Sequence, residues 1–497
     1  MCRNRLVLGA SIAAMLIANG ANAGTLWIAR LSQANENPPT GAPYTGTGFL
    51  VLNDAETSAT VTATHNVPTN LLTGGHIHRG LPGTNGPIIF PFPSPLSPVG
   101  PLVWAIPTAD VGNLKAGGLY MNFHTSVNPG GAIRSPLLRF LMAPAATNGA
   151  QLAVANALDV SAGYSADLDQ FLQANAVAST AAQTQALDEL SGRTLYADGR
   201  EALGAMTDFQ DTLFLQTAGA KGAGVSLFGT VGDTFGKWEG RSGQAGAKVS
   251  RPSFMAGFDY GLTDGAHAGL AVGYADGKDK FDNGAGETTA KTTSLNAFAS
   301  TGGDGVVFTG IAGYGWSKLD TSRNLSGAAR TAASSHDAKT WALAAKVSVP
   351  LSLGGDTKIA PYGQIDLQES TIDGYAETGA GSLGLRVPKQ TVKSASAEIG
   401  AAVALPLSAE PGGLTARLQA GWRQRLNDGG DAFATSFAGS PVGFVTTVES
   451  PGRSAAHISA SISGALAPNL TLSAGYRGLI GSHADAHMVQ LRLALTL

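Results

Sequence analysis

The last nine residues of the chain, Val489-Gln-Leu-Arg-Leu-Ala-Leu-Thr-Leu497, decide its fold class. Aliphatic side chains occupy every odd position, and the even positions carry Gln490, Arg492, Ala494 and Thr496. Successive side chains of an extended strand point to opposite faces, so this segment has one apolar face and one polar or small face. Such a strand fits the wall of a barrel that has lipid outside and a polar lumen.

The same period of two recurs throughout the second half of the chain. It is clearest in residues 253–262, 340–349, 414–423 and 470–477. We count about twelve strand candidates after residue 225, an even number as in most single-chain outer-membrane barrels. We therefore predict a twelve-stranded antiparallel transmembrane β-barrel over residues 223–497. The alternative is a soluble β-sandwich or propeller, because alternation requires only one wet face.

Composition agrees with a membrane barrel. Charged residues make up only 13% of the chain, hydrophobic residues make up 43%, and there are 66 glycines. The net charge is −3 and no run of Lys and Arg occurs, so the sequence lacks the basic patch that typically binds nucleic acid. We expect no nucleic-acid partner.

Residues 1–23 are typical of a secretory signal peptide. Arg3 and Arg5 precede an apolar stretch at 6–17, and Ala21-Asn22-Ala23 supplies a cleavage site. The stretch is too short to span a bilayer as a helix. Cys2 is the only cysteine, so cleavage leaves a mature protein without thiols. This excludes a cysteine-based zinc site, a redox pair and a thiol nucleophile.

Two regions precede the predicted barrel. Residues 24–142 contain short apolar runs separated by frequent turn residues, which predicts a small Greek-key-like β-sandwich. Residues 143–222 are interpreted as a linker and a helix, so the fold class is all-β with one helix. The helix is expected over 176–214, where leucines recur at helical spacing and Gly192, Gly199 and Gly204 keep it slim.

That helix has two interpretations. It is either an ordinary amphipathic linker helix or a helix that threads the lumen of the barrel. Five charged residues of the strands should face the lumen, where they would contact the helix or simply be solvated. They are Asp259, Lys346, Arg417, Arg423 and Arg477.

Residues 176–497 resemble the C-terminal translocator of type V autotransporters. Gln185-Ala-Leu-Asp-Glu-Leu-Ser-Gly192 followed by Leu195-Tyr196 resembles the family's junction before the barrel, and Leu470-Thr-Leu-Ser-Ala-Gly-Tyr-Arg477 resembles its closing hairpin. The resemblance implies a helix-plugged, twelve-stranded barrel in the bacterial outer membrane with an exported N-terminal passenger. It also implies outer-membrane lipid and the barrel-assembly machinery as partners.

Two details of the resemblance carry expectations of their own. The family usually ends on Phe or Trp, whereas this chain ends on Leu497, so we expect less efficient assembly. Self-cleaving members cut at an Asn in the helix, and residues 176–214 contain none, so we expect the passenger to stay attached.

The passenger region, 24–142, resembles a CHRD (chordin-like) domain. Three pieces match in order and spacing: residues 31–39 with Gly46 and Gly48, Gly75-His-Ile-His-Arg-Gly80 with 85–87, and residues 118–125 with Asn128-Pro-Gly-Gly-Ala-Ile-Arg134. The family usually has Glu where this chain has Ala132, which argues against an acid acting at that position.

Three histidines of this region form the only cluster suited to chemistry. His76 and His78 point to the same side of a strand, and His124 from a second strand would complete a three-nitrogen site for copper or zinc. His65 is a possible fourth ligand. The alternative is that these histidines only form hydrogen bonds to loops and backbone carbonyls. No hydrolase elbow, phosphate-binding loop or zinc-protease motif occurs, so we do not expect an enzyme.

We expect an autotransporter-like outer-membrane protein that displays an uncleaved CHRD domain on the cell surface, for adhesion or for binding a surface ligand or host protein. One alternative is an outer-membrane channel or anchor with a periplasmic CHRD domain. Another is a metal-binding surface protein that uses the three histidines.

Overall fold

The computed structural model describes residues 24–217, 223–241, 243–263, 265–301, 305–354, 357–408, 412–427, 431–448 and 452–497. The expected signal peptide, residues 1–23, lies outside the described residues. The chain divides into two compact units. One contains the N-terminal β-sheet domain, and the other contains the barrel.

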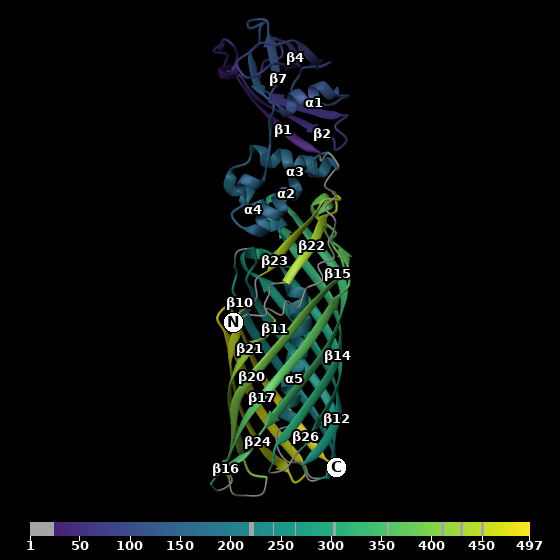
Figure 1. Ribbon diagram of the computed structural model, residues 1–497, viewed down its shortest axis with the longest axis vertical. Helices are drawn as coiled ribbons and strands as arrows, with labels where there is room; N and C mark the ends of the chain where they lie inside the picture. The colour runs from purple at the N-terminus through teal and green to yellow at the C-terminus, as the bar shows by residue number, and fades with distance from the viewer. Residues whose placement is uncertain are drawn as a thin grey trace, which may run out of the picture. The chain divides into compact units, whose positions relative to one another are not determined.

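The N-terminal domain is built on one curled antiparallel sheet (Figure 1). Its strands are hydrogen-bonded in the order β5-β4-β7-β8-β1-β2-β3-β6, and β9 pairs with β1. The two edge strands approach each other, because Phe90 of β5 stacks on Trp104 of β6 with ring centroids 5.1 Å apart. The sheet therefore encloses a single apolar core, which includes Leu50, Ile77 and Phe123.

The elements of this domain follow the turn signals of the sequence. They are β1 (Thr25–Ser32), β2 (Thr45–Leu52), β3 (Ala59–His65), β4 (Leu72–Arg79), β5 (Ile88–Pro91), β6 (Val99–Trp104), α1 (Thr108–Lys115), β7 (Leu119–Thr125), β8 (Ile133–Pro136) and β9 (Leu138–Arg139).

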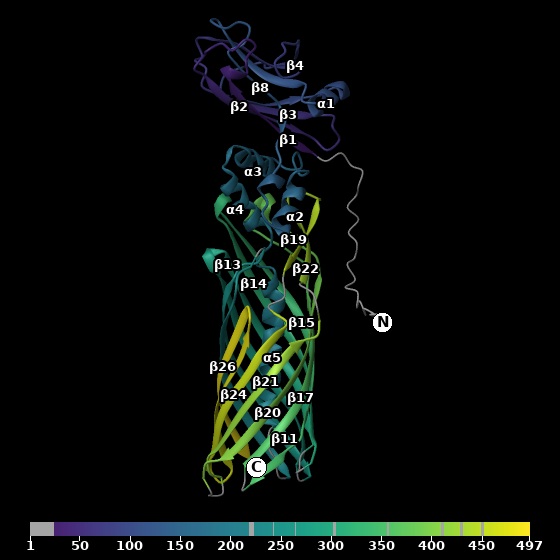
Figure 2. The same cartoon turned by 60° about the vertical axis from the view of Figure 1, so that its left-hand side comes forward.

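Twelve strands within the described residues close into the predicted barrel, each antiparallel to both neighbours (Figures 1 and 2). The strands are β10 (Gly224–Trp238), β11 (Ala247–Thr263), β12 (Ala266–Phe281), β13 (Gly286–Ser300), β14 (Val307–Leu325), β15 (Arg330–Ser348), β17 (Thr357–Ile372), β20 (Gln390–Pro406), β21 (Thr415–Arg425), β24 (Ser454–Ala467), β25 (Leu470–Gly481) and β26 (Ala484–Thr496). The prediction of a closed twelve-stranded barrel is confirmed.

The C-terminal strand closes the barrel by pairing with the first strand, β10. The backbone N–H of Leu497 donates to the carbonyl of Val225 at 2.9 Å. Val489, Leu491 and Leu493 are exposed on the outer face, and the residues between them are less exposed. The period of two therefore separates an outer apolar face from the lumen. Aromatic side chains also lie on the outer face, among them Tyr260, Tyr274 and Trp422.

Short strands extend the connections of the barrel. β16 (Leu351–Gly354) pairs with β17. A separate four-stranded sheet has the order β18-β19-β22-β23. Its strands are β18 (Tyr375–Ala376), β19 (Leu385–Val387), β22 (Asp431–Phe437) and β23 (Gly443–Val448).

The segment before the barrel holds more helix than expected. The alanine-rich residues taken as a linker form α2 (Gly149–Leu158) and α3 (Ala166–Val177), consistent with the high helix propensity of alanine. The hydroxyl of Ser165 caps α3 by accepting from the backbone N–H of Leu168 at 3.1 Å. No helix in the described part of the chain is both long and apolar enough to span a membrane.

The single helix expected over 176–214 is two helices, α4 (Thr180–Leu190) and α5 (Tyr196–Gln216). Gly192 lies in the turn between them with φ +67°, a conformation that favours glycine. The turn lets α5 enter the barrel as a helix of its own.

Candidate functional site

The helix α5 lies inside the barrel, surrounded by its strands (Figure 2). Its apolar side chains, including Met206, Phe209 and Leu213, are buried against a patch on the lumen wall. Phe228 and Ile311 belong to that patch. Of the two interpretations of this segment, the structure corresponds to the helix that threads the lumen.

Two glycines let α5 approach the wall closely. A Cβ at Gly204 would lie 2.5 Å from Nη2 of Arg251, and a Cβ at Gly199 would lie 2.8 Å from Cγ2 of Val392. Both distances are too short for a side chain, so any larger residue would displace the helix or the wall. Glycine is therefore required here for space, at some cost in helix propensity.

Acidic residues of α5 pair with arginines of the barrel wall. Arg251 of β11 donates to both carboxylate oxygens of Glu201, from Nε at 3.1 Å and from Nη2 at 2.7 Å. Its Nη1 also donates to Asp208 at 2.8 Å. All three side chains are almost fully buried. This two-pronged pairing gives both charge compensation and a fixed geometry.

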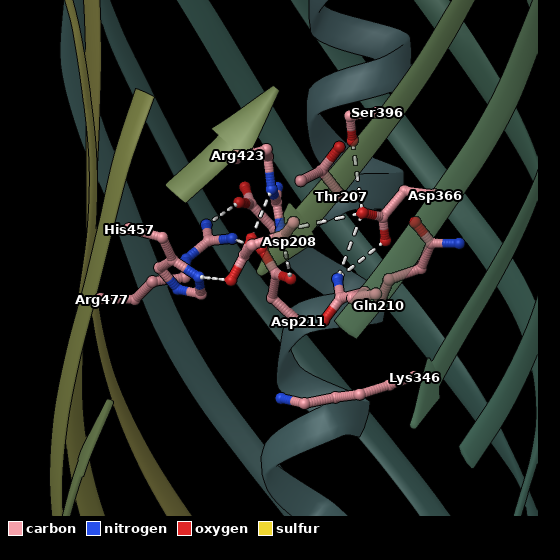
Figure 3. Close-up of polar contacts among 12 residues, drawn as sticks. Thr207, Asp208, Gln210, Asp211, Lys346, Asp366, Ser396, Arg423, His457 and Arg477 are labelled. Carbon is pink, nitrogen blue, oxygen red and sulfur yellow. Dashed lines mark hydrogen bonds and ion pairs between the residues drawn. The ribbon is translucent and has the colours of Figure 1, made fainter. Parts of the chain in front are cut away.

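A second set of pairs shares Asp208 with the first and extends to Asp211 (Figure 3). Arg477 of β25 bridges Asp208 and Asp211, and Arg423 of β21 reaches Asp211 at 3.5 Å. Arg423 is itself held by Glu398, which accepts from its Nε at 2.7 Å. Three carboxylates of α5, those of Glu201, Asp208 and Asp211, thus meet arginines of the wall.

Asp198, near the N-terminal end of α5, has three partners outside the helix. It accepts from the Thr321 hydroxyl at 2.9 Å and from the Tyr375 hydroxyl at 3.2 Å. Nε2 of His336 lies 3.1 Å from the same carboxylate. Because Tyr375 belongs to β18, the helix is tied to the long connection between β17 and β20 as well as to the wall.

The five charged residues expected in the lumen all lie on that side of the wall. Asp259 meets Gln216 of α5 at 3.2 Å, and the ammonium group of Lys346 lies over the ring of Tyr362 at 3.9 Å from its centre. Arg417 is partly buried, and Arg423 and Arg477 pair with α5 as described.

Sequence reasoning missed Arg251, although the signal was present. This arginine shares strand parity with Ser253, Met255 and Asp259, which belong to the segment with clear alternation. Extending that segment two residues toward its N-terminal end would have placed Arg251 in the lumen.

In the N-terminal domain, the antiparallel pairing of β4 with β7 brings the three predicted histidines together. His76 lies opposite Asn122, and Gly74 lies opposite His124. One ring nitrogen of each of His76, His78 and His124 lies within 4.8 Å of the other two. The ring centroids are 5.0 Å apart for His76 and His124, and 5.6 Å for the other two pairs.

Backbone carbonyls fix two of these rings. Nδ1 of His78 donates to the carbonyl of Gly86 at 3.0 Å, and Nδ1 of His124 donates to the carbonyl of Pro129 at 3.0 Å. A carbonyl can only accept, so each ring must carry its proton on Nδ1 and a lone pair on Nε2. Nε2 of both rings and Nδ1 of His76 are buried and have no hydrogen-bond partner.

His65 does not join the cluster. Its Nε2 lies 2.8 Å from the carbonyl of Pro95, and its Nδ1 accepts from the backbone N–H of Val67 at 3.2 Å. Both ring nitrogens therefore form hydrogen bonds with the backbone of loops. This is the structural role that the alternative interpretation gave to all four histidines.

Burial lowers the pKa of each clustered histidine. For His76 the pKa falls to about 4, first because of burial and then because of repulsion from His124 and His78. The pKa values of His78 and His124 are also lowered, again mainly by burial. The three imidazoles are consequently neutral at neutral pH, the form that binds metal ions.

An aromatic ring and a buried acid lie beside the cluster. Tyr120 stacks on His78 with ring centroids 4.8 Å apart. The guanidinium of Arg134 lies over the ring of Tyr120, 5.0 Å from its centroid. Ala132 occupies the position where CHRD domains usually carry Glu. The nearby carboxylate of Glu36 lies 3.8 Å from Nε of Arg134, and burial raises the pKa of Glu36 to about 7, against the lowering effect of Arg134.

Comparison with known proteins matches both parts of the chain to families. The Autotransporter beta-domain family matches residues 227–477, about half of the chain, and the CHRD domain family matches residues 27–137. No curated protein gives a significant sequence match.

Solved structures similar to this chain include three autotransporter barrels. The translocator domain of NalP from Neisseria meningitidis is 17% identical, with a TM-score of 0.49 over 60% of this chain and 98% of that one. The beta domain of the Bordetella autotransporter BrkA is 14% identical, with a TM-score of 0.42 over 55% and 100%. The transport unit of AIDA-I from Escherichia coli is 14% identical, with a TM-score of 0.38 over 55% and 90%.

The family matches and the closed, helix-filled barrel agree on one identity. The chain belongs to the Autotransporter beta-domain family of outer-membrane β-barrels and carries an N-terminal CHRD domain.

Proposed function

We propose that the barrel anchors this chain in the outer membrane and displays its CHRD domain, uncleaved, on the cell surface for binding or adhesion. The observation that carries the proposal is α5, which fills the lumen and is tied to the wall by buried ion pairs. A helix held in this way serves as a permanent tether rather than as a passing substrate.

The direction of α5 supports display on the outside. Gln216 at its C-terminal end contacts Asp259, close to the short connection 264–265. Asp198 at its other end contacts Tyr375 in the connection between β17 and β20. Outer-membrane barrels have short periplasmic turns and longer extracellular loops.

The lengths of the connections between strands indicate which end of the barrel is extracellular and which is periplasmic. The longest, 373–389 and 426–453, both lie at the end where α5 begins. The opposite end has short connections such as 264–265 and 468–469, and it holds Leu497. On this assignment, the chain that precedes Tyr196 leaves the barrel on the extracellular side.

The absence of Asn from residues 176–214 supports a passenger that stays attached, on the pattern of the self-cleaving members. The partners we propose are outer-membrane lipid, the barrel-assembly machinery and a surface ligand or host protein. Exposed loops of the CHRD domain are the natural recognition sites, because loops usually carry binding residues in β-sheet domains.

Protease shaving of intact cells tests the proposal. An epitope tag inserted between Asp54 and Ala55 lies in the exposed turn that joins β2 to β3. We expect the tag to disappear from intact cells while the heat-modifiable barrel and a soluble periplasmic marker survive. Lysed cells serve as the control for accessibility.

Loss of the tag only after lysis would contradict the proposal. The protein would then be an anchor or channel with a periplasmic CHRD domain. Release of the tag into the medium without protease would contradict the uncleaved passenger but leave surface display intact.

A further inference from the structure

We propose that His76, His78 and His124 form a mononuclear binding site for a late first-row divalent metal ion, with copper(II) bound more tightly than zinc(II). The inference concerns the CHRD domain itself and does not depend on which side of the membrane the domain occupies. It goes beyond display, because it assigns the domain a ligand.

The spacing of the three rings fits one shared ion. Imidazole nitrogens bind zinc at about 2.0–2.1 Å, so the ring centre lies about 3 Å from the metal. Three rings in tetrahedral directions around one ion then have their centres about 5 Å apart. The observed separations, 5.0 Å and twice 5.6 Å, are close to this value. Small rotations of the rings would bring the candidate nitrogens, which lie within 4.8 Å of one another, to the spacing of about 3.4 Å that a bound ion requires.

The hydrogen bonds of the rings direct their lone pairs as a metal site requires. Metal-binding histidines usually donate their second ring N–H to a carbonyl or carboxylate, which fixes the tautomer and the ring orientation. His78 and His124 do so, to Gly86 and Pro129. The stacked ring of Tyr120 further limits rotation of His78.

The other buried nitrogens of the cluster form no hydrogen bond with the described residues of the folded domain. Nδ1 of His76 and Nε2 of both His78 and His124 are buried without a hydrogen-bond partner. Leaving a buried polar atom unsatisfied costs about 1–3 kcal/mol, so three such atoms on rings whose centroids lie 5.0–5.6 Å apart are costly unless a ligand satisfies them. A metal ion satisfies all three together.

The donor set selects the class of ion. Among the described residues, the group consists of three histidines and includes no Asp, Glu or Cys. Neutral imidazoles suit copper and zinc, whereas calcium and magnesium require oxygen ligands. Affinities of divalent ions follow an order in which copper(II) exceeds zinc(II), and three protein ligands leave a fourth position open to water or a small ligand.

Titration of the full-length protein in detergent tests the site. The protein carries a tag without histidines, is stripped with a chelator, and is then titrated with copper(II) sulfate or zinc(II) sulfate by calorimetry. We expect one ion per chain. The electron paramagnetic resonance spectrum of the copper form should show hyperfine coupling to three nitrogens.

Histidine variants locate the ion. His124→Gln should weaken copper binding at least about 100-fold, beyond the 10- to 100-fold loss typical of removing an outer hydrogen-bond partner. His65→Gln is the matched control, because His65 belongs to the same domain but directs both ring nitrogens into a loop. We expect the control to bind copper as tightly as the unmodified protein.

Two results would overturn the inference. One is a stripped wild-type protein that takes up neither ion at one per chain. The other is unchanged binding by the double variant His76→Gln/His124→Gln, which would place the ion elsewhere. If a variant does not fold, the nitrogen coupling of the wild-type protein still decides the question, because a site elsewhere would not show three nitrogens. Failure of metal binding leaves the shaving experiment unaffected.

Discussion

The barrel lumen and the histidine cluster both bury polar groups, but they satisfy them differently. In the lumen, the carboxylates of α5 meet arginines, a histidine or hydroxyls of the wall. In the cluster, each of three neutral rings keeps one buried nitrogen without a partner. Some buried lumen atoms also lack a hydrogen-bond partner, but each carboxylate of α5 has at least one partner on the wall. For the unpartnered ring nitrogens of the cluster, we propose that the partner is a bound metal ion.

The pairing of buried polar groups distinguishes a structural polar network from a binding site. A buried charge that loses its partner is strongly destabilising, so the carboxylates that hold a helix in the lumen must be paired. A binding site must instead keep donor or acceptor atoms available, at some cost to the stability of the unbound domain. Substitutions that remove a partner from the lumen network should therefore destabilise the protein, whereas substitutions that remove an unpartnered ring nitrogen of the cluster should not.

The largest effect is expected where the lumen network is broken. Arg251→Met leaves Glu201 without its two-pronged partner and removes one of the two arginines of Asp208. We expect the free energy of unfolding of the barrel to fall by about 3–5 kcal/mol. Denaturant titration of the folded, heat-modifiable form measures the change.

Lys248→Met is the control for this prediction. Lys248 lies on the same strand, β11, but is exposed. We expect a change below about 0.5 kcal/mol, as at most surface positions. Equal midpoints for Arg251→Met and the unmodified protein would show that the lumen pairs do not hold the helix.

A smaller effect is expected from filling the space that glycine leaves. Gly204→Ala places a methyl group 2.5 Å from the guanidinium of Arg251 and should cost about 1–3 kcal/mol, as overpacking generally does. Gly112→Ala in α1 is the matched control, because nothing lies within 4 Å of its Cβ. There the gain in helix propensity should stabilise the protein by about 0.5–1 kcal/mol. The same sign of change at both positions would refute the close-approach explanation.

The smallest effect is expected at the buried acid beside the cluster. Burial raises the pKa of Glu36 to about 7, so the folded domain binds a proton more tightly than the unfolded chain. Taken alone, this group makes the CHRD domain less stable as pH rises from about 4.5 to about 7, by on the order of 1 kcal/mol, whereas the lowered pKa values of the three clustered histidines act in the opposite direction. The stability of the unmodified protein relative to Glu36→Gln should therefore fall across that range when thermal unfolding of both proteins is followed.

Glu56→Gln provides the comparison for the pH experiment. Glu56 pairs with Lys115 at the surface, where an ion pair contributes little. This variant should keep the slope of the unmodified protein. A stability difference between Glu36→Gln and the unmodified protein that does not change with pH would assign the pH dependence to other groups.

The period of two in the sequence was enough to predict the strands, their number and the outward face of β26. It was enough because alternation is a local property that each strand carries independently. His76 and His78 were also predictable as a pair, since residues i and i+2 of a strand share a face. His124 could be joined to them only through the order of motifs in the CHRD resemblance.

Other features depend on contacts that no local pattern encodes. Asp208 and Arg477 pair across 269 residues of sequence, and Arg323 pairs with Glu377 through the loop after β17. The division of one expected helix into α4 and α5 rests on a single glycine turn, which periodicity alone did not separate from a helix interior. The position of Glu36 beside Arg134 likewise follows from the pairing of β1 with β8, which places Ser32 opposite Arg134.

A tether of the proposed kind requires that α5 remain in the lumen of the finished barrel. A Cβ on Gly199 would lie 3.2 Å from Cβ of Val392, near the separation of about 3.5–4.5 Å found in disulfides. Gly199→Cys with Val392→Cys, in a Cys2→Ser background, should therefore crosslink in isolated outer membranes. The pair Gly199→Cys with Ala402→Cys, in a Val392→Ala background that relieves the same contact, is the control, because Ala402 lies ten residues further along β20, about 33 Å away.

Electrophoresis without reductant, with maleimide labelling of free thiols, reads the result. A crosslinked form for the 199–392 pair, and none for the 199–402 pair, is the predicted outcome. If both pairs remain fully reactive toward maleimide in the membrane, α5 does not occupy the lumen, and the tether proposed for the CHRD domain is contradicted.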